Sequence, residues 1–247
     1  MTSQSKMVTG TYILYNGTVY AEVEGDISEP PFTIEKIPTT THDDGGHASK
    51  IPGESEDGDL RFKMNFVNDT AQAALRVLAR AKTTGMWQLV YPRSFGSLGY
   101  EIPGFISNLS KSLPQKGSVP KWDIAITPTS TVTERTTAAA NLTTPFLDVI
   151  DEDSVHPTPT PAYAAAVYAY DHTMLQAVTA NFTITPTATT GTIYVDGTIV
   201  ATGAPSGAIG YTLANFPTGS IKTVFVVVTE ATKVPTIYRL RLTRGTA

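Results

Sequence analysis

The chain has 247 residues, enough for one large or two ordinary domains, and charged residues make up only 16% of it, against roughly 25% in typical soluble domains. Its formal net charge is -4, which argues against a nucleic-acid clamp or a binder of anionic membranes. The absence of cysteine excludes disulfides, cysteine zinc sites and thiol nucleophiles. The first ten residues lack an apolar core, so we expect no signal peptide there, and no apolar run is long enough to span a membrane.

The first half of the chain is predicted to begin with β-structure. Residues 1–10 are polar and predict an N-terminal arm. Residues 11–14 and 18–23 are rich in β-prone residues, and Asn16-Gly17 between them is the turn most favoured in short hairpins. Residues 32–37 predict a further strand.

A long acidic loop is predicted next, over residues 39–58. Residues 39–59 carry six acidic side chains and one lysine, and they show no periodicity. Loops of this length inside compact domains are usually functional or disordered. His42, Asp43, Asp44 and His47 bring imidazoles and carboxylates close together, but their spacing fits no standard zinc pattern, so we expect a solvated loop without a metal.

A strand–helix–strand unit over residues 58–92 organises this half of the chain. Residues 59–67 alternate apolar and polar side chains, as a half-buried strand does. Asp69 is a candidate N-cap with Gln72 in a capping box, and Gly85 is a candidate end signal after Thr83 and Thr84. The helix between them has an apolar stripe at Ala71, Ala74, Leu75, Leu78 and Ala81, and residues 86–91 predict the second strand.

The same helix carries a basic edge formed by Arg76, Arg80 and Lys82. A solvated face is the simplest interpretation. The alternative is an acidic partner surface, and the chain itself contains one in the loop at residues 39–59. If copies stacked head to tail, this loop would meet the helix of the next copy, and such contacts generate open filaments.

The remainder of the chain is predicted as more β-structure interrupted by a linker. Residues 100–113 and 119–127 predict two strands that complete a domain over residues 11–135. Residues 136–161 are rich in Thr, Pro and Ala and predict an extended linker. Residues 162–247 contain short strand candidates and an Asp196-Gly197 turn, which favours a small β-sandwich. The candidates are residues 164–168, 181–185, 191–195, 198–201, 208–213, 223–229 and 236–242.

The sequence gives no positive indication of an enzyme. The carboxylates Asp148, Asp151, Glu152 and Asp153 lie in the predicted linker, which lacks the rigid support that catalytic acids need. No nucleophile elbow, phosphate loop or dinucleotide fingerprint is present. We therefore expect no catalytic activity, no cofactor and no metal.

The order of these elements resembles that of the major tail tube proteins of long-tailed bacteriophages. The hairpin and acidic loop are followed by GDLRFKMNFVNDTAQAALRVLARAKTTGMWQLVYP, then by YEIPGFISNLSKSLP and KWDIAITPTS. In that family a glycine-led strand carries a phenylalanine, an Asp-x-x-Gln step starts a helix, and a tryptophan strand follows. The resemblance covers residues 1–135. In the last part, GTIYVDGTIVATGAPSGAI, VFVVVTE and TIYRLRLTR resemble bacterial cadherin-like or immunoglobulin-like domains, which decorate such tail proteins.

The resemblance implies a mainly β fold: a tail-tube barrel or sandwich with one packed α-helix, followed by an immunoglobulin-like β-sandwich decoration. It implies hexameric rings that stack into a tube in the virion tail, assembled in the bacterial host cytoplasm. DNA and the tape-measure protein would pass through the tube, and tail terminator and distal tail proteins would contact it. The sandwich would project outward, towards the host cell surface. A contractile or a non-contractile tail remains open, as does the alternative function of a surface-binding adhesin or carbohydrate-binding module.

Three groups of residues are the candidate sites under this interpretation. The inter-ring stacking loop comprises His42, Asp43, Asp44, His47, Lys50, Glu54, Glu56 and Asp57. The basic helix edge is the second group. The third is a candidate lumen face formed by Thr18, Tyr20, Glu22 and Glu24, which alternate along one predicted strand.

Overall fold

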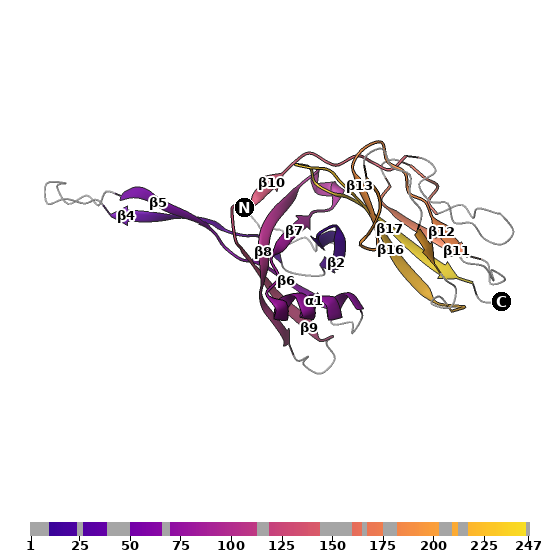
Figure 1. Ribbon diagram of the computed structural model, residues 1–247, viewed down its shortest axis with the longest axis horizontal. Helices are drawn as coiled ribbons and strands as arrows, with labels where there is room; N and C mark the ends of the chain where they lie inside the picture. Colours follow the sequence, from indigo (N-terminus) through magenta and orange to yellow (C-terminus); the bar gives the residue numbers. More distant parts are fainter. Residues whose placement is uncertain are drawn as a thin grey trace. The chain divides into compact units, whose positions relative to one another are not determined.

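The protein is mainly β, with one α-helix in the part of the chain that the structure describes. The computed structural model describes residues 10–23, 27–38, 50–65, 70–112, 119–143, 160–164, 167–174, 182–202, 209–211 and 217–245 (Figure 1). The chain divides into two compact units. Unit 1 comprises residues 1–15, 20–92 and 100–134; unit 2 comprises residues 16–19, 93–99 and 135–247.

Unit 1 is built on an eight-stranded sheet with the order β2-β1-β7-β8-β9-β6-β3, and β10 pairs with β8. A separate two-stranded sheet is formed by β4 and β5. The strands are β1 (Thr11–Tyr15), β2 (Thr18–Val23), β3 (Ile27–Ser28), β4 (Phe32–Pro38), β5 (Lys50–Asp57), β6 (Leu60–Asn65), β7 (Gly85–Val90), β8 (Gly99–Ser112), β9 (Lys121–Pro128) and β10 (Thr133–Arg135). The α-helix is α1 (Thr70–Ala81), and a 3-10 turn follows β7 at Arg93–Phe95.

The core of unit 1 forms between α1 and one face of the sheet. The alternation predicted for β6 is confirmed, because Leu60, Phe62 and Met64 are buried. Leu75 from α1 and Trp87 from β7 join them in the same core. One face of the sheet is therefore apolar and covered by the helix.

A buried glutamine fixes α1 on this face. The Gln72 side chain donates from Nε2 to the Asn65 carbonyl (2.7 Å) and accepts at Oε1 from the Trp122 indole (3.1 Å). Gln72 was predicted to return a bond to the helix cap at Asp69, which lies outside the described residues. The side-chain amide of Gln72 connects the helix with β6 and β9.

The helix ends differently from the prediction. Lys82 takes the left-handed conformation (φ 51°) that the sequence assigned to a glycine, and Thr83 N–H donates to the Leu78 carbonyl (3.2 Å). This is the geometry of a Schellman-type C-cap. Gly85 lies in β7, where an added Cβ would come within 2.4 Å of the Tyr15 ring. Close packing, and not a helix end, requires glycine there.

Unit 2 contains a five-stranded sheet with the order β11-β17-β16-β13-β14 and a two-stranded sheet of β12 and β15. One core draws side chains from both sheets, including Ile184 of β12 and Val226 and Leu240 of β16 and β17. β11 and β17 are parallel, whereas the pairs β12–β15, β13–β14, β13–β16 and β16–β17 are antiparallel. The strands are β11 (Ala169–Met174), β12 (Phe182–Ile184), β13 (Thr192–Val195), β14 (Thr198–Thr202), β15 (Ile209–Tyr211), β16 (Ile221–Thr229) and β17 (Thr236–Arg244).

Three expectations need correction. β5 lies inside the segment predicted as a loop, because its pairing with β4 and not its own periodicity makes it a strand. Residues 164, 167 and 168 are not in a strand; the strand there is β11. Ala139 and Leu142, from the segment predicted as a linker, are buried in the core of unit 2.

Candidate interaction surfaces

The most exposed regular structure in unit 1 is the β4–β5 ribbon, the two-stranded sheet formed by β4 and β5. Every side chain of β4 from Phe32 to Ile37 is exposed, and β5 is exposed except at Gly53 and Asp57, which are half-buried. Figure 1 shows the ribbon extending beyond the eight-stranded sheet. Four large apolar side chains remain open to solvent on it: Phe32, Ile34, Ile37 and Ile51.

The strand register sorts the charges of the ribbon onto two faces. Thr33 lies opposite Glu56 and Ile37 lies opposite Ile51. Directly paired residues point to the same side of a sheet, and so do residues two apart along a strand. Thr33, Glu35, Ile37, Ile51 and Glu56 therefore share one face, which we call the acidic face.

Gly53 supports this assignment across the register shift that follows Ile34. An added Cβ on Gly53 would lie 3.0 Å from both the Glu35 Cβ and the Ile37 Cγ1, so these two side chains stand on the same side. The other face carries Lys36, opposite Pro52, together with Phe32 and Ile34. Glu54, two residues from Glu56 along β5, belongs to the same face, so the acidic face has three carboxylates and two isoleucines, and no lysine.

The predicted stacking-loop residues are only partly described. Lys50, Glu54, Glu56 and Asp57 lie on β5. Asp57 is tied to unit 1 itself, since its Oδ2 accepts from the Val132 N–H (2.8 Å). The remaining four residues, His42, Asp43, Asp44 and His47, lie outside the described residues.

The basic helix edge lies on the solvent side of α1. Arg76 is half-buried, and Arg80 and Lys82 are exposed. Val77 stands between the two arginines and is also exposed. Across the described ranges, none of the three basic side chains has a carboxylate within salt-bridge distance. The outer side of α1 therefore carries cationic side chains, with the exposed Val77 beside Arg80.

Of the predicted lumen face on β2, the structure describes the side chains of Thr18 and Tyr20. Tyr20 packs against Trp87 and Tyr15, with ring centroids 6.5 Å and 6.3 Å apart, and burial together with Tyr15 raises the pKa of the Tyr20 hydroxyl. Thr18 is half-buried, and Glu24 and the side chain of Glu22 lie outside the described part. The assignment of a lumen face to this strand stays a prediction.

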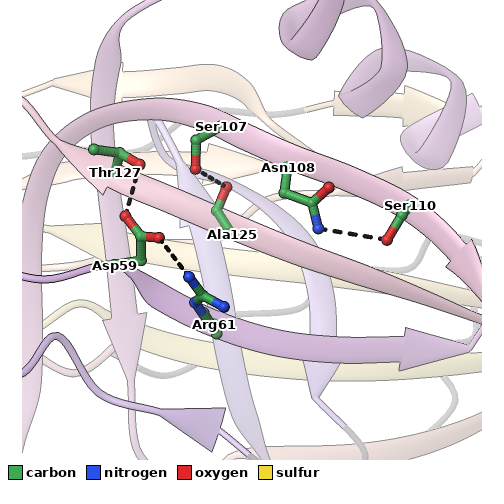
Figure 2. Close-up of polar contacts among 7 residues, drawn as sticks. All are labelled: Asp59, Arg61, Ser107, Asn108, Ser110, Ala125 and Thr127. Carbon is green, nitrogen blue, oxygen red and sulfur yellow. Dashed lines mark hydrogen bonds and ion pairs between the residues drawn. The ribbon is translucent and has the colours of Figure 1, made fainter.

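A polar surface that was not singled out covers the side of the sheet opposite α1. In β6 the residues Arg61, Lys63 and Asn65 alternate with the buried ones, and they lie opposite Ala125, Asp123 and Lys121 of β9. Figure 2 shows the contacts at one end of this surface: Asp59 accepts from Thr127 (2.7 Å) and pairs with Arg61 (3.0 Å). The alternation of β6 was the sequence feature that could have identified it.

The neighbouring strand β8 extends this polar surface with hydroxyl and amide groups. Ser107 donates to the Ala125 carbonyl (3.3 Å), and Asn108 contacts Ser110 (3.4 Å), as Figure 2 also shows. Lys63 and Asp123 are directly paired across β6 and β9, so cationic and anionic groups are interspersed on this surface. The surface is suited to contact with water or a passing polar molecule, and not to tight capture of one charge type.

Neither a metal cluster nor a helix able to span a membrane is found among the described residues. Within the described ranges, no three His, Asp or Glu side chains come together in a way that could hold a metal ion. No helix in the part of the chain that the structure describes is long and apolar enough to cross a membrane.

No protein-family model and no curated protein sequence matches the chain. Among solved structures, it is similar to a chain of the virion of a native gene transfer agent particle, with 14% sequence identity and a TM-score of 0.41 over 50% of this chain and 94% of that chain. It is similar to a chain of the extended sheath-tube complex of the PVC extracellular contractile injection system, with 12% sequence identity and a TM-score of 0.42 over 55% of this chain and 95% of that chain. It is also similar to a chain of the tube-terminating cap of the anti-feeding prophage, with 12% sequence identity and a TM-score of 0.43 over 56% of this chain and 95% of that chain. Similarity of this degree does not assign the chain to a family.

Proposed function

We propose that this chain is a structural subunit of a phage-like tail, and specifically a tail tube subunit that forms hexameric rings stacked into a DNA-conducting tube. The observation that carries the proposal is the β4–β5 ribbon. An isolated two-stranded ribbon is at best marginally stable in water. This ribbon has both faces exposed, together with four large apolar side chains. It is the kind of element that becomes ordered and covered when copies associate.

The resemblance of residues 1–135 to tail tube proteins supports the same proposal independently of the ribbon. It rests on the order of hairpin, acidic segment, strand, helix and tryptophan strand. β6, α1 and β7 follow this order along the chain. The partners would be further copies of the chain, the tape-measure protein, and terminator and distal tail proteins. The protein would be part of the virion tail and would not act as an enzyme.

The polar surface opposite α1 is compatible with the wall of a DNA conduit. A strongly cationic wall would bind phosphates and slow the passage of DNA. Here the Arg61 charge is balanced by Asp59 at 3.0 Å, and Lys63 stands beside Asp123 on the next strand. Interspersed charges leave only a small net potential at such a wall.

Unit 2 is proposed to be an immunoglobulin-like decoration domain. Its two sheets share one core, and its last strand, β17, lies between a parallel β11 and an antiparallel β16. A two-sheet sandwich of short strands is the architecture of that class. Contact with a host cell surface would be its role on the outside of a tail.

Electron microscopy and sedimentation of the purified full chain test the proposal. We expect rings with six-fold symmetry, or tubes of uniform diameter, as the protein concentration rises. A chain that stays monomeric at all concentrations, also in the presence of the other tail proteins, would contradict it.

A further inference from the structure

We propose that the acidic face of the β4–β5 ribbon of one copy docks on the solvent face of α1 in a second copy. In this contact Glu35 and Glu56 pair with Arg76 and Arg80, and the Ile37–Ile51 pair covers Val77. The inference rests on the proposed function only in that the chain must associate with itself. It names the two surfaces that meet.

The first argument is charge complementarity within one chain. The acidic face carries three carboxylates, Glu35, Glu54 and Glu56, and no lysine, whereas α1 carries two arginines and no acid between Thr70 and Ala81. Lys36, the cation nearest Glu35 along β4, belongs to the opposite face of the ribbon. The opposite face also carries Asp57, opposite Phe32, but that carboxylate already accepts from the Val132 N–H. Docking by the opposite face would bring Lys36 towards arginine, so the charges favour the acidic face.

The second argument is spacing. Glu56 is opposite Thr33, and Glu35 is two residues further along β4, so the two carboxylates form a diagonal pair about 7–8 Å apart. Arg76 and Arg80 are four residues apart on one helical face, which separates them by about 6 Å. The two spacings, that of the glutamates and that of the arginines, differ by less than the length of an arginine side chain. Both carboxylates can therefore be engaged at once.

The third argument is the uncovered apolar surface on both sides. Ile37 and Ile51 form a cross-strand pair that is exposed, and Val77 is 66% exposed between the two arginines. Each patch has an apolar side chain beside its charges. A contact that removes the three side chains from water adds a hydrophobic contribution to the charge pairing.

Cross-linking tests the contact directly, because the chain contains no cysteine of its own. An Ile37→Cys variant is mixed with a Val77→Cys variant and oxidised. We expect a disulfide-linked pair, since side chains in contact satisfy the distance that a disulfide requires. Lys36→Cys mixed with Val77→Cys is the matched control, because residue 36 is equally exposed and points to the opposite face. Equal cross-linking by both pairs, or by neither, would overturn the inference.

Charge reversal tests the pairing in the full-length chain. Glu35→Arg with Glu56→Arg, and separately Arg76→Glu with Arg80→Glu, should each raise the concentration needed for assembly by about tenfold, since attraction becomes repulsion. The combined variant should assemble again, while Lys36→Glu, on the opposite face of the ribbon, should behave as the wild type. Normal assembly of the single reversals, or no rescue in the combined variant, would overturn the pairing. A specific Ile37–Val77 cross-link in a chain that forms no rings or tubes would support the contact and contradict the proposed function.

Discussion

Replacing Leu75 by alanine tests whether the buried face of α1 stabilises unit 1. Leu75 is 2% exposed and lies in the core with Phe62, Met64 and Trp87. Truncating a buried leucine costs about 2–5 kcal/mol, because transfer energy and packing are both lost. Leucine and alanine have similar helix propensities, so almost none of the loss arises from the helix itself. We expect the free energy of unfolding of unit 1 to fall by about 3 kcal/mol, a value within that range.

Val77→Ala is the matched control on the same helix. Val77 is two residues away and 66% exposed, so its removal leaves no cavity. Exposed substitutions of this kind usually change stability by no more than about 0.5 kcal/mol. Both variants replace an aliphatic side chain by alanine in the middle of α1. The difference between their stabilities therefore measures the effect of burial.

Tryptophan fluorescence during urea denaturation measures this difference. The chain has only two tryptophans, Trp87 and Trp122, and both belong to unit 1, so the fluorescence reports on that unit alone. Samples must be dilute enough to be monomeric, because Val77 belongs to the proposed contact between copies. With a urea m-value of about 1–3 kcal/mol per molar, Leu75→Ala should lower the midpoint by roughly 1–3 M. Equal losses from the two variants would refute the assigned orientation of α1.

Three further changes test other parts of the structure. In Gly104→Ala the new Cβ would lie 2.5 Å from the Thr127 carbonyl oxygen, so β8 and β9 must separate and the fluorescence midpoint should fall; an unchanged midpoint would contradict this close approach. Tyr238→Phe removes the oxygen that accepts from the buried Leu142 N–H (3.0 Å), which should cost about 1–3 kcal/mol and accelerate hydrogen exchange at Leu142; unaltered exchange would argue against this bond. Hydrogen bonds from Lys233 and Ala140 lower the pKa of Glu230 below its ordinary value of 4.5, so the stabilisation is present above that pH and is lost as the pH falls through the lowered pKa. Glu230→Gln should remove this acid dependence from the unfolding of unit 2, and an identical pH profile would refute the assignment.

Periodicity predicted those elements whose own side chains form a core. Alternation placed β6 correctly because Leu60, Phe62 and Met64 meet α1, and the spacing of Leu75 and Leu78 identified the helix that covers them. Local patterns failed where a distant partner makes the element. β5 contains Pro52 and Gly53 and shows no alternation, yet its pairing with β4 holds it as a strand. Ala139 and Leu142 lie in a segment whose composition is typical of a linker, and only their contacts with the core of unit 2 show that they are buried.

The candidate contact was visible in the sequence only as opposite charges on two segments. The acidic loop and the basic helix edge could be paired from composition, but not the residues that meet. Glu35 lies outside the predicted loop, and only the register of β4 and β5 places it on one face with Glu56. The same register assigns Lys36 to the other face. Strand pairing therefore decides which charged side chains share a face. The net charge of a segment gives no such information.

The proposed contact also has a consequence for the form of the assembly. The ribbon and the helix are different surfaces of one chain, so a copy whose ribbon is docked still offers its own helix to a further copy. Contacts of this head-to-tail kind close into rings or continue as filaments, whereas a reciprocal two-fold contact ends at a dimer. Sedimentation of the wild-type chain separates these outcomes. We expect species that grow with concentration or that have the size of a ring. A dimer as the final state would mean that two copies dock their ribbons on each other reciprocally. This contact alone would then not build a tube.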